Sequence, residues 1–129
     1  MPKRFYLATR KDRSTEAAPL LEALTTGWER TYTWTDHDLA GPDGYAKIAQ
    51  AELAGVREAD VLIVLMPGGF GTHVEIGAAL ALGKPVILHA PDRETLETPY
   101  ACPFHYHSGV KLLVSEVVDV DAILACLPL

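Results

Sequence analysis

Hydrophobic residues along the chain fall into short unbroken runs separated by amphipathic stretches. Residues 60–66, Asp-Val-Leu-Ile-Val-Leu-Met, form the clearest run, and such a run is typical of a parallel strand that is covered on both faces. Shorter runs at 4–9, 86–89 and 110–114 predict three more strands. The β-branched and aromatic residues of 29–35 predict another. The pattern therefore predicts five strands.

Between these strands the apolar residues recur at helical spacing. Helices are predicted at 14–28, after Gly44 through Ile48, Leu53 and Val56, from Thr72 to about Leu82 and at 118–126. Pro19 is compatible with the first helix only in its first turn. The segment Gly41-Pro-Asp-Gly44 reads as a break before the second helix, and 90–109 reads as one long loop. Strands and helices therefore alternate along the chain.

This alternation implies right-handed crossovers and a parallel sheet. We expect a single α/β domain over residues 1–129, Rossmann-like, with flavodoxin-like strand order 2-1-3-4-5 and helices on both faces. Ligands of such sheets bind beyond the carboxyl ends of the strands, where the strand order reverses. The unusual residues predicted at that edge are Tyr6, Thr9, Arg10, Trp34, Gly68, Gly69, Gly71 and Thr72. They define a candidate ligand crevice.

The glycine-rich turn at 67–72 leads into an apolar helix in which Glu75 is the only acid. Glycines let the backbone approach a ligand, and a helix start offers free N–H groups. One interpretation is structural: Thr72-His-Val-Glu75 fits a capping box, with Glu75 folding back onto the Thr72 N–H. The other is chemical: a carboxylate one turn into the helix can attack the anomeric carbon of a sugar. The two interpretations are compatible.

Charge and composition narrow the classes of partner and compartment. The 129 residues carry a formal net charge of −6, so the chain offers no overall positive field for the phosphates of a nucleic acid polymer. Cys102 and Cys126 lie far apart without CxxC spacing, which favours reduced thiols. The apolar runs are too short to span a bilayer, and no secretory signal is apparent at the start. We expect a cytoplasmic protein without a membrane partner.

Four segments resemble the nucleoside 2-deoxyribosyltransferase family and the related 2′-deoxynucleoside 5′-phosphate N-hydrolases. They are Phe5-Tyr-Leu-Ala8, Ala51-Glu-Leu-Ala-Gly-Val56, Ala59-Asp60, and the most specific, Gly71-Thr-His-Val-Glu-Ile-Gly-Ala-Ala-Leu-Ala-Leu-Gly-Lys-Pro85. The resemblance covers most of the chain. It implies a nucleoside 2-deoxyribosyltransferase-like domain that binds a nucleoside or nucleotide, needs no metal or organic cofactor, and forms a homodimer or larger homo-oligomer.

The resemblance also implies roles for individual residues. Glu75 matches the nucleophile and Tyr6 the tyrosine that orients it. Glu52 occupies the position where the family usually has an aspartate that holds the sugar or assists proton transfer, and it is one methylene longer. The stretch 67–70 lacks the additional acid with which transferases handle the nucleobase, so the resemblance gives base exchange no support.

The glycine turn carries a second, local similarity. Pro67-Gly-Gly-Phe-Gly-Thr-His-Val-Glu75 looks like the PGGxGTxxE motif of LOG-type phosphoribohydrolases, which release a base from a nucleoside monophosphate. The basic residues that follow the first strand, Arg10, Lys11 and Arg13, could hold a 5′-phosphate or could simply be solvated. Trp34 could stack on a base or belong to the core.

The loop at 90–109 contains two histidines, His105 and His107, close to Cys102. Long loops in compact domains are often lids or interfaces, so these histidines are expected in a lid or in a segment donated to a neighbouring subunit. We expect no metal there, because no second ligand pair has zinc spacing.

Three hypotheses of function follow. The leading hypothesis is an enzyme that cleaves or transfers the N-glycosidic bond of a nucleoside or nucleoside monophosphate, with Glu75 attacking C1′ and Glu52 assisting. The alternative is a non-catalytic sensor that binds a nucleotide or related metabolite in the same crevice. A purely structural module would bind no ligand and would leave Glu75 explained by capping alone. An enzyme turns its ligand over, whereas a sensor is only stabilised by it.

Overall fold

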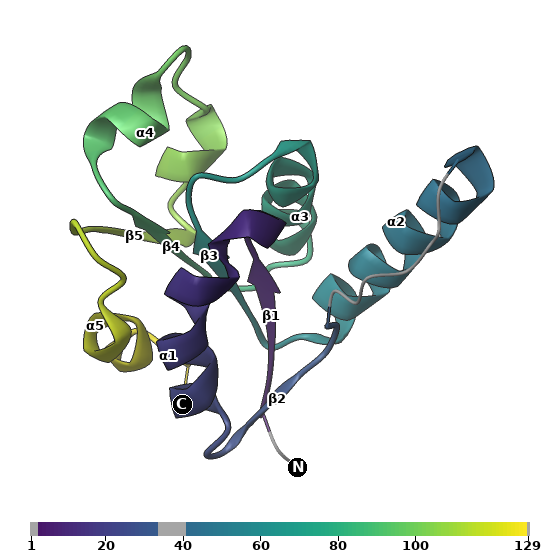
Figure 1. Cartoon of the computed structure of the whole chain (residues 1–129), viewed down its shortest axis with the longest axis horizontal. Coiled ribbons are helices and arrows are strands. Elements are labelled where there is room, and N and C mark those ends of the chain that lie inside the picture. The colour runs from purple at the N-terminus through teal and green to yellow at the C-terminus, as the bar shows by residue number, and fades with distance from the viewer. Residues whose placement is uncertain (1–2, 34–40, 129) are drawn as a thin grey trace.

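The computed structural model describes residues 3–33 and 41–128, and its core is a five-stranded parallel sheet (Figure 1). The strands lie in the order β2-β1-β3-β4-β5, as expected, and every neighbouring pair is parallel. Their bounds are β1 Lys3–Ala8, β2 Trp28–Arg30, β3 Val61–Leu65, β4 Val86–Ala90 and β5 Val110–Val114. The order reverses between β1 and β3, which is where ligands bind in sheets of this kind.

Helices cover both faces of the sheet (Figure 1). Their bounds are α1 Ser14–Leu24, α2 Gly41–Glu58, α3 Phe70–Ala81, α4 Arg93–Glu97 and α5 Val120–Ala125, with single 3₁₀ turns at Lys11–Arg13 and Pro103–Tyr106. One face carries α2 and α3, and the opposite face carries α1 and α5. Among the described residues, none of the helices combines the length and apolarity needed to cross a membrane.

Successive side chains of β1 enter two separate hydrophobic cores, one on each face of the sheet. Phe5 and Leu7 face the side of α1 and α5, whereas Tyr6 and Ala8 face the side of α2 and α3. The central strand β3 is fully buried on both sides, as its unbroken apolar run predicts. Tyr6, only 3% exposed, is therefore part of a core as well as of the candidate crevice.

The first helix and second strand differ from the sequence expectation. The helix predicted over 14–28 ends at Leu24, and Trp28 instead begins β2. Pro19 lies beyond the first turn, as the sixth residue of α1, so the expectation that it falls in the first turn is wrong, and it offers no N–H to the helix at this position. The strand predicted over 29–35 ends at Arg30.

Two segments expected to be irregular are partly helical. Gly41 has φ +83°, a left-handed conformation suited to glycine, and Pro42 follows within the first turn of α2, where a missing N–H costs nothing. The expected break is therefore a helix start. Within 90–109, Asp92 accepts a hydrogen bond from the Thr95 N–H at 2.7 Å and caps the short helix α4.

Candidate active site

The glycine turn after β3 determines where α3 begins. The Thr72 Oγ1 accepts a hydrogen bond from the Gly69 N–H at 3.2 Å, so Gly69 is the N-cap and Thr72 the third helical residue. A Cβ on Gly68 would lie 2.5 Å from the Thr72 Cγ2, so only glycine fits there. The expected capping box with Glu75 is therefore wrong: the helix starts earlier, and Thr72 takes the capping role.

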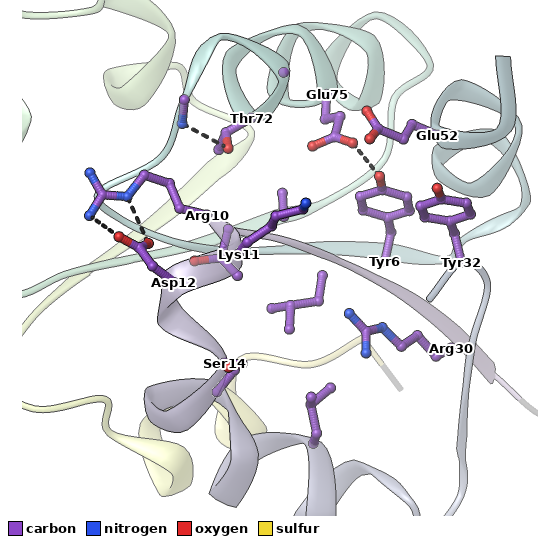
Figure 2. A pocket seen from close by; sticks show the side chains of 17 residues that line it. Tyr6, Arg10, Lys11, Asp12, Ser14, Arg30, Tyr32, Glu52, Thr72 and Glu75 are labelled. Atoms are coloured by element: carbon purple, nitrogen blue, oxygen red, sulfur yellow. Dashed lines mark hydrogen bonds and ion pairs between the residues drawn. The ribbon is translucent and has the colours of Figure 1, made fainter. Parts of the chain in front are cut away.

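Because Thr72 caps the helix, the Glu75 carboxyl group makes a different contact. Its side chain is buried, 6% exposed, and its Oε2 accepts a hydrogen bond from the Tyr6 hydroxyl of β1 (Figure 2). A buried carboxyl group without a partner is costly, and Tyr6 supplies the partner. The structure therefore brings together Tyr6 and Glu75, 69 positions apart in the sequence.

Two stacked tyrosines form the floor beneath this carboxyl group. The rings of Tyr6 and Tyr32 lie 6.1 Å apart with an interplanar angle of 7°. Helix α2 passes close above them at Gly55, where a Cβ would lie 2.8 Å from the Tyr32 Cβ and 2.9 Å from the Tyr6 Cε2. Only glycine allows this close approach, which also brings Glu52, one turn earlier in α2, to the site.

Glu52 and Glu75 form a carboxyl pair above the two rings (Figure 2). The pKa of Glu75 is raised to about 8, mainly by burial; the Tyr6 hydrogen bond lowers it, and the charge of Glu52 and a hydrogen bond with it raise it. Burial also raises the pKa of the half-buried Glu52. The pKa of Tyr6 is raised by burial and by the charge of Glu75. The pair thus retains a proton at a higher pH than isolated carboxyl groups would.

These side chains line a cavity of about 750 Å³, large enough for a small-molecule ligand. Besides the carboxyl pair and the tyrosines, the lining includes Leu7, Ala8, Thr9, Arg10, Lys11, Asp12, Ser14, Ala17, Leu21, Arg30, Gly69, Gly71 and Thr72. The carboxyl pair lies at one end, and the polar segment after β1 lies across from it (Figure 2).

Most of the residues predicted to hold a ligand line this cavity, although their own contacts differ. Thr9 donates to the Leu65 carbonyl at 2.8 Å and so ties the end of β1 to β3. Arg10 forms a two-point ion pair with Asp12 at 3.1 Å, exposed to solvent. Gly68 is not part of the lining, and Trp34 lies outside the described residues.

The two histidines of the predicted lid do not reach the cavity. His105 is 2% exposed and contacts His73 of α3, while His107 accepts a hydrogen bond from the Gly109 N–H at 2.8 Å. His73, Cys102 and His105 offer donor atoms that lie together and could hold a metal ion.

Arg30 and Tyr32 are lining residues that the sequence reasoning missed. Both come from the end of β2 and its continuation, two positions apart, so extended backbone directs them to the same face. The Arg30 Nε is buried and has no hydrogen-bond partner among the described residues, and burial lowers the pKa of this guanidinium. Successive side chains of an extended segment point to opposite faces, so Arg30 and Tyr32 share one face of the segment 29–32. This two-residue spacing is the signal that would have identified them.

The solved structures similar to this one include two enzymes and a designed protein. The CMP N-glycosidase of Clostridium botulinum is 25% identical, with a TM-score of 0.65 over 95% of this chain and 96% of that chain. A 2-deoxyribosyltransferase of Bacillus psychrosaccharolyticus is 21% identical, with a TM-score of 0.51 over 68% and 72%, and shows the fold alone. A designed Rossmann 2x3 protein is also similar in fold, 15% identical with a TM-score of 0.52 over 94% and 82%.

No curated protein matches the sequence significantly. The family model of nucleoside 2-deoxyribosyltransferase, however, matches residues 3–122, which include every part of the carboxyl site. The fold and the family resemblance seen in the sequence are both confirmed. The chain therefore belongs to the nucleoside 2-deoxyribosyltransferase family, whose chemistry is the cleavage or transfer of the N-glycosidic bond of nucleosides.

Proposed function

We propose that this enzyme hydrolyses the N-glycosidic bond of a nucleoside 5′-monophosphate, with Glu75 as the nucleophile. The observation that carries the proposal is the pairing of Glu75 with the Tyr6 hydroxyl and with Glu52 at the end of one cavity. Two neighbouring carboxyl groups, one oriented by a hydroxyl donor, supply a nucleophile and a proton carrier for reaction at a sugar carbon.

In the first step the Glu75 carboxylate attacks C1′. A bond forms between its oxygen and C1′, the C1′–N bond breaks, and its electron pair leaves with the base. The Tyr6 hydroxyl donates to Glu75 and lowers its pKa, which favours the attacking carboxylate. The proton shared by the carboxyl pair passes to Glu52 and from there to the departing base, so Glu52 is ionised when the second step begins. In the second step water attacks C1′ of the glycosyl ester, Glu75 leaves as a carboxylate, and Glu52 assists by accepting the proton of water.

The opposite part of the cavity suits a 5′-phosphate. The segment after β1 contributes Thr9, Arg10, Lys11 and Ser14 to the lining, and basic and hydroxyl groups are good phosphate donors. The CMP N-glycosidase that this structure resembles is named for a nucleoside monophosphate. The LOG-type enzymes that share the PGGxGTxxE motif likewise release a base from a nucleoside monophosphate. Because Arg10 is engaged by Asp12, a phosphate would share this guanidinium or displace the Asp12 carboxylate.

Hydrolysis is favoured over base exchange by the composition of the glycine turn. Residues 67–70 contain no carboxylate that could hold an incoming base. Water is then the expected acceptor. Adding a free acceptor base to the reaction should leave the yield of new nucleoside at zero.

The test is chromatographic detection of free base after incubation with a panel of nucleosides, deoxynucleosides and their 5′-monophosphates. We expect the wild-type enzyme to release base from monophosphates and Glu75→Gln to lose at least a thousandfold of this rate, because the substitution removes the nucleophile. Glu58→Gln, on the exposed end of α2, serves as the matched control and should keep the wild-type rate. An unchanged rate in Glu75→Gln would disprove the mechanism.

The panel also separates the enzyme from a sensor. A nucleotide that raises the melting temperature without any release of base would favour the non-catalytic alternative. The family resemblance further implies a homodimer or larger assembly, and the spacing of the two cysteines together with the short apolar runs favours a cytoplasmic location. Light scattering at micromolar concentration measures the first of these directly.

A further inference from the structure

Three potential metal ligands converge outside the active-site cavity. His73 lies in the first turns of α3, while Cys102 and His105 lie at the 3₁₀ turn Pro103–Tyr106. The ligand atoms of the three side chains are all within 4.8 Å of one another. The Nε2 atoms of the two histidines are 3.0 Å apart. None of the three lines the cavity that contains Glu75.

The backbone fixes the tautomer of His73. Its Nδ1 lies 2.8 Å from the Gly69 carbonyl oxygen, and because a carbonyl only accepts hydrogen bonds, Nδ1 must carry the proton. In the neutral imidazole, Nε2 then presents a lone pair toward His105. A ring N–H held by a backbone carbonyl, with the other nitrogen free to bind, is the usual arrangement of a metal-bound histidine.

His105 is held in place without being committed to a tautomer. It is 2% exposed, and its Nδ1 is buried without a hydrogen-bond partner among the described residues. A hydrogen bond between the two Nε2 atoms would need only one proton and would not involve the Cys102 sulfur. A cation between the two Nε2 atoms instead uses both lone pairs and the nearby sulfur together.

We propose that His73, Cys102 and His105 bind a divalent zinc-class ion. Two imidazoles and one thiolate are the ligands that zinc prefers. Tetrahedral coordination with Zn–N of about 2.0–2.1 Å separates two nitrogens by about 3.3 Å, so the histidine pair opens by only a few tenths of an ångström. On binding, the Cys102 thiol releases its proton to solvent as the Zn–S bond forms. The fourth position is left for water or a further donor.

An ion at this position would connect two parts of the chain. It would tie the segment 102–105 to α3 beside Gly69, which lines the active-site cavity. The inference does not depend on the proposed hydrolase activity. Its test can therefore succeed or fail independently of any measurement of base release.

The experiment titrates metal-free, reduced protein with Co²⁺ and then with Zn²⁺. We expect one Co²⁺ per chain, with the near-ultraviolet thiolate-to-cobalt band and visible bands of tetrahedral cobalt, and displacement of both by Zn²⁺. Cys102→Ser should abolish the thiolate band and weaken Zn²⁺ binding at least tenfold. The matched control is Cys126→Ser, which removes the other free cysteine and should leave both signals unchanged.

Several results would overturn the proposal. These are the absence of saturable Zn²⁺ binding at micromolar concentration, equal binding by wild type and Cys102→Ser, or loss of the thiolate band in Cys126→Ser. His73→Gln provides a second test, since it keeps the cysteine and removes one imidazole. If circular dichroism shows that Cys102→Ser is unfolded, unchanged Zn²⁺ affinity in folded His73→Gln overturns the proposal, and at least tenfold weaker binding supports it.

Discussion

The Tyr6 hydroxyl governs the charge of Glu75 more directly than any other described group. It donates to Glu75 from a ring that is almost fully buried, and burial raises the pKa of that hydroxyl beyond its usual range. Tyr6 therefore stays protonated and remains a donor throughout the neutral range. A donor that cannot ionise keeps the adjoining carboxyl group more acidic than burial alone would allow.

Tyr6→Phe isolates this effect. We expect kcat/KM for base release to fall about 10- to 100-fold, the usual range for loss of a hydrogen bond to a charged group. Because the bond lowers the pKa of Glu75, its removal should also move the acid limb of the rate profile to higher pH. Rates measured between pH 5 and 10 check both effects. An unshifted limb would mean that Tyr6 contributes only packing.

Glu75→Gln should stabilise the fold in a manner that depends on pH. The groups that face Glu75 are Tyr6, Tyr32 and Glu52, and its pKa is raised, mainly by burial, from an ordinary 4.5 to about 8. Between these pH values the unfolded chain releases a proton that the folded chain keeps. The free energy of unfolding of the wild type therefore falls as the pH rises through this range.

Glutamine has no such proton, so its advantage should grow from pH 4.5 and level off above pH 8. We expect a gain in the free energy of unfolding of about 1–3 kcal/mol at pH 8. Urea unfolding of both proteins at pH 4.5 and pH 8 measures the difference. Equal gains at the two pH values would contradict the raised pKa.

At the scale of elements, the approach of α2 to β1 assembles the site. The contact depends on Gly55, whose missing side chain leaves room for the rings of Tyr6 and Tyr32. The same approach carries Glu52 to Glu75. A helix displaced outward would separate the two carboxyl groups even if both elements remained folded.

Gly55→Ala tests this dependence. A Cβ at 2.8–2.9 Å from both tyrosines should overpack the contact, lower the free energy of unfolding by about 1–3 kcal/mol and reduce base release. Gly77→Ala in α3 is the matched control, because its Cβ would meet nothing within 4 Å and alanine favours helix by about 0.4–1 kcal/mol. Urea unfolding and the activity assay together decide. Equal stability of the two variants would refute the close-packing argument.

The spacing of hydrophobic residues along the chain predicted the strands and the longer helices. Elements that depend on tertiary contacts were missed. The buried run at 60–66 gave β3, and the strand order followed from the alternation of strands and helices. The short helix α4 has too few residues for periodicity to reveal it. The start of α3 was misassigned because the Thr72 hydroxyl caps the helix at Gly69.

The site was predicted unevenly for a related reason. Resemblance supplied Tyr6, Glu52 and Glu75, which the structure brings together. Tyr32 was missed because its stacking on Tyr6 depends on how β2 lies beside β1. The convergence of His73 with Cys102 and His105 is also tertiary, since about thirty residues separate these segments in the sequence.

For the whole molecule, the sheet separates two cores that have no members in common. Ile76 of α3 belongs to one, Ile123 of α5 to the other, and both are fully buried. Each is a contact of helix against sheet on its own side. Their contributions to stability should therefore be independent.

Ile76→Val and Ile123→Val should each lower the free energy of unfolding by about 0.5–1.5 kcal/mol. The double variant should lose the sum of the two to within about 0.5 kcal/mol. Denaturant unfolding of the four proteins completes the cycle. A coupling energy well above this limit would show that strain passes through the sheet.

The membership of Tyr6 in the core also bears on how this enzyme could acquire a new substrate. The floor of its cavity is fixed by packing against Gly55 and Tyr32, so variation there endangers folding before it alters selectivity. The opposite wall, residues 10–14, is largely solvent-exposed and can change at little cost to stability. A combinatorial library should therefore diversify that wall, and natural relatives with different nucleotide preferences should diverge there first.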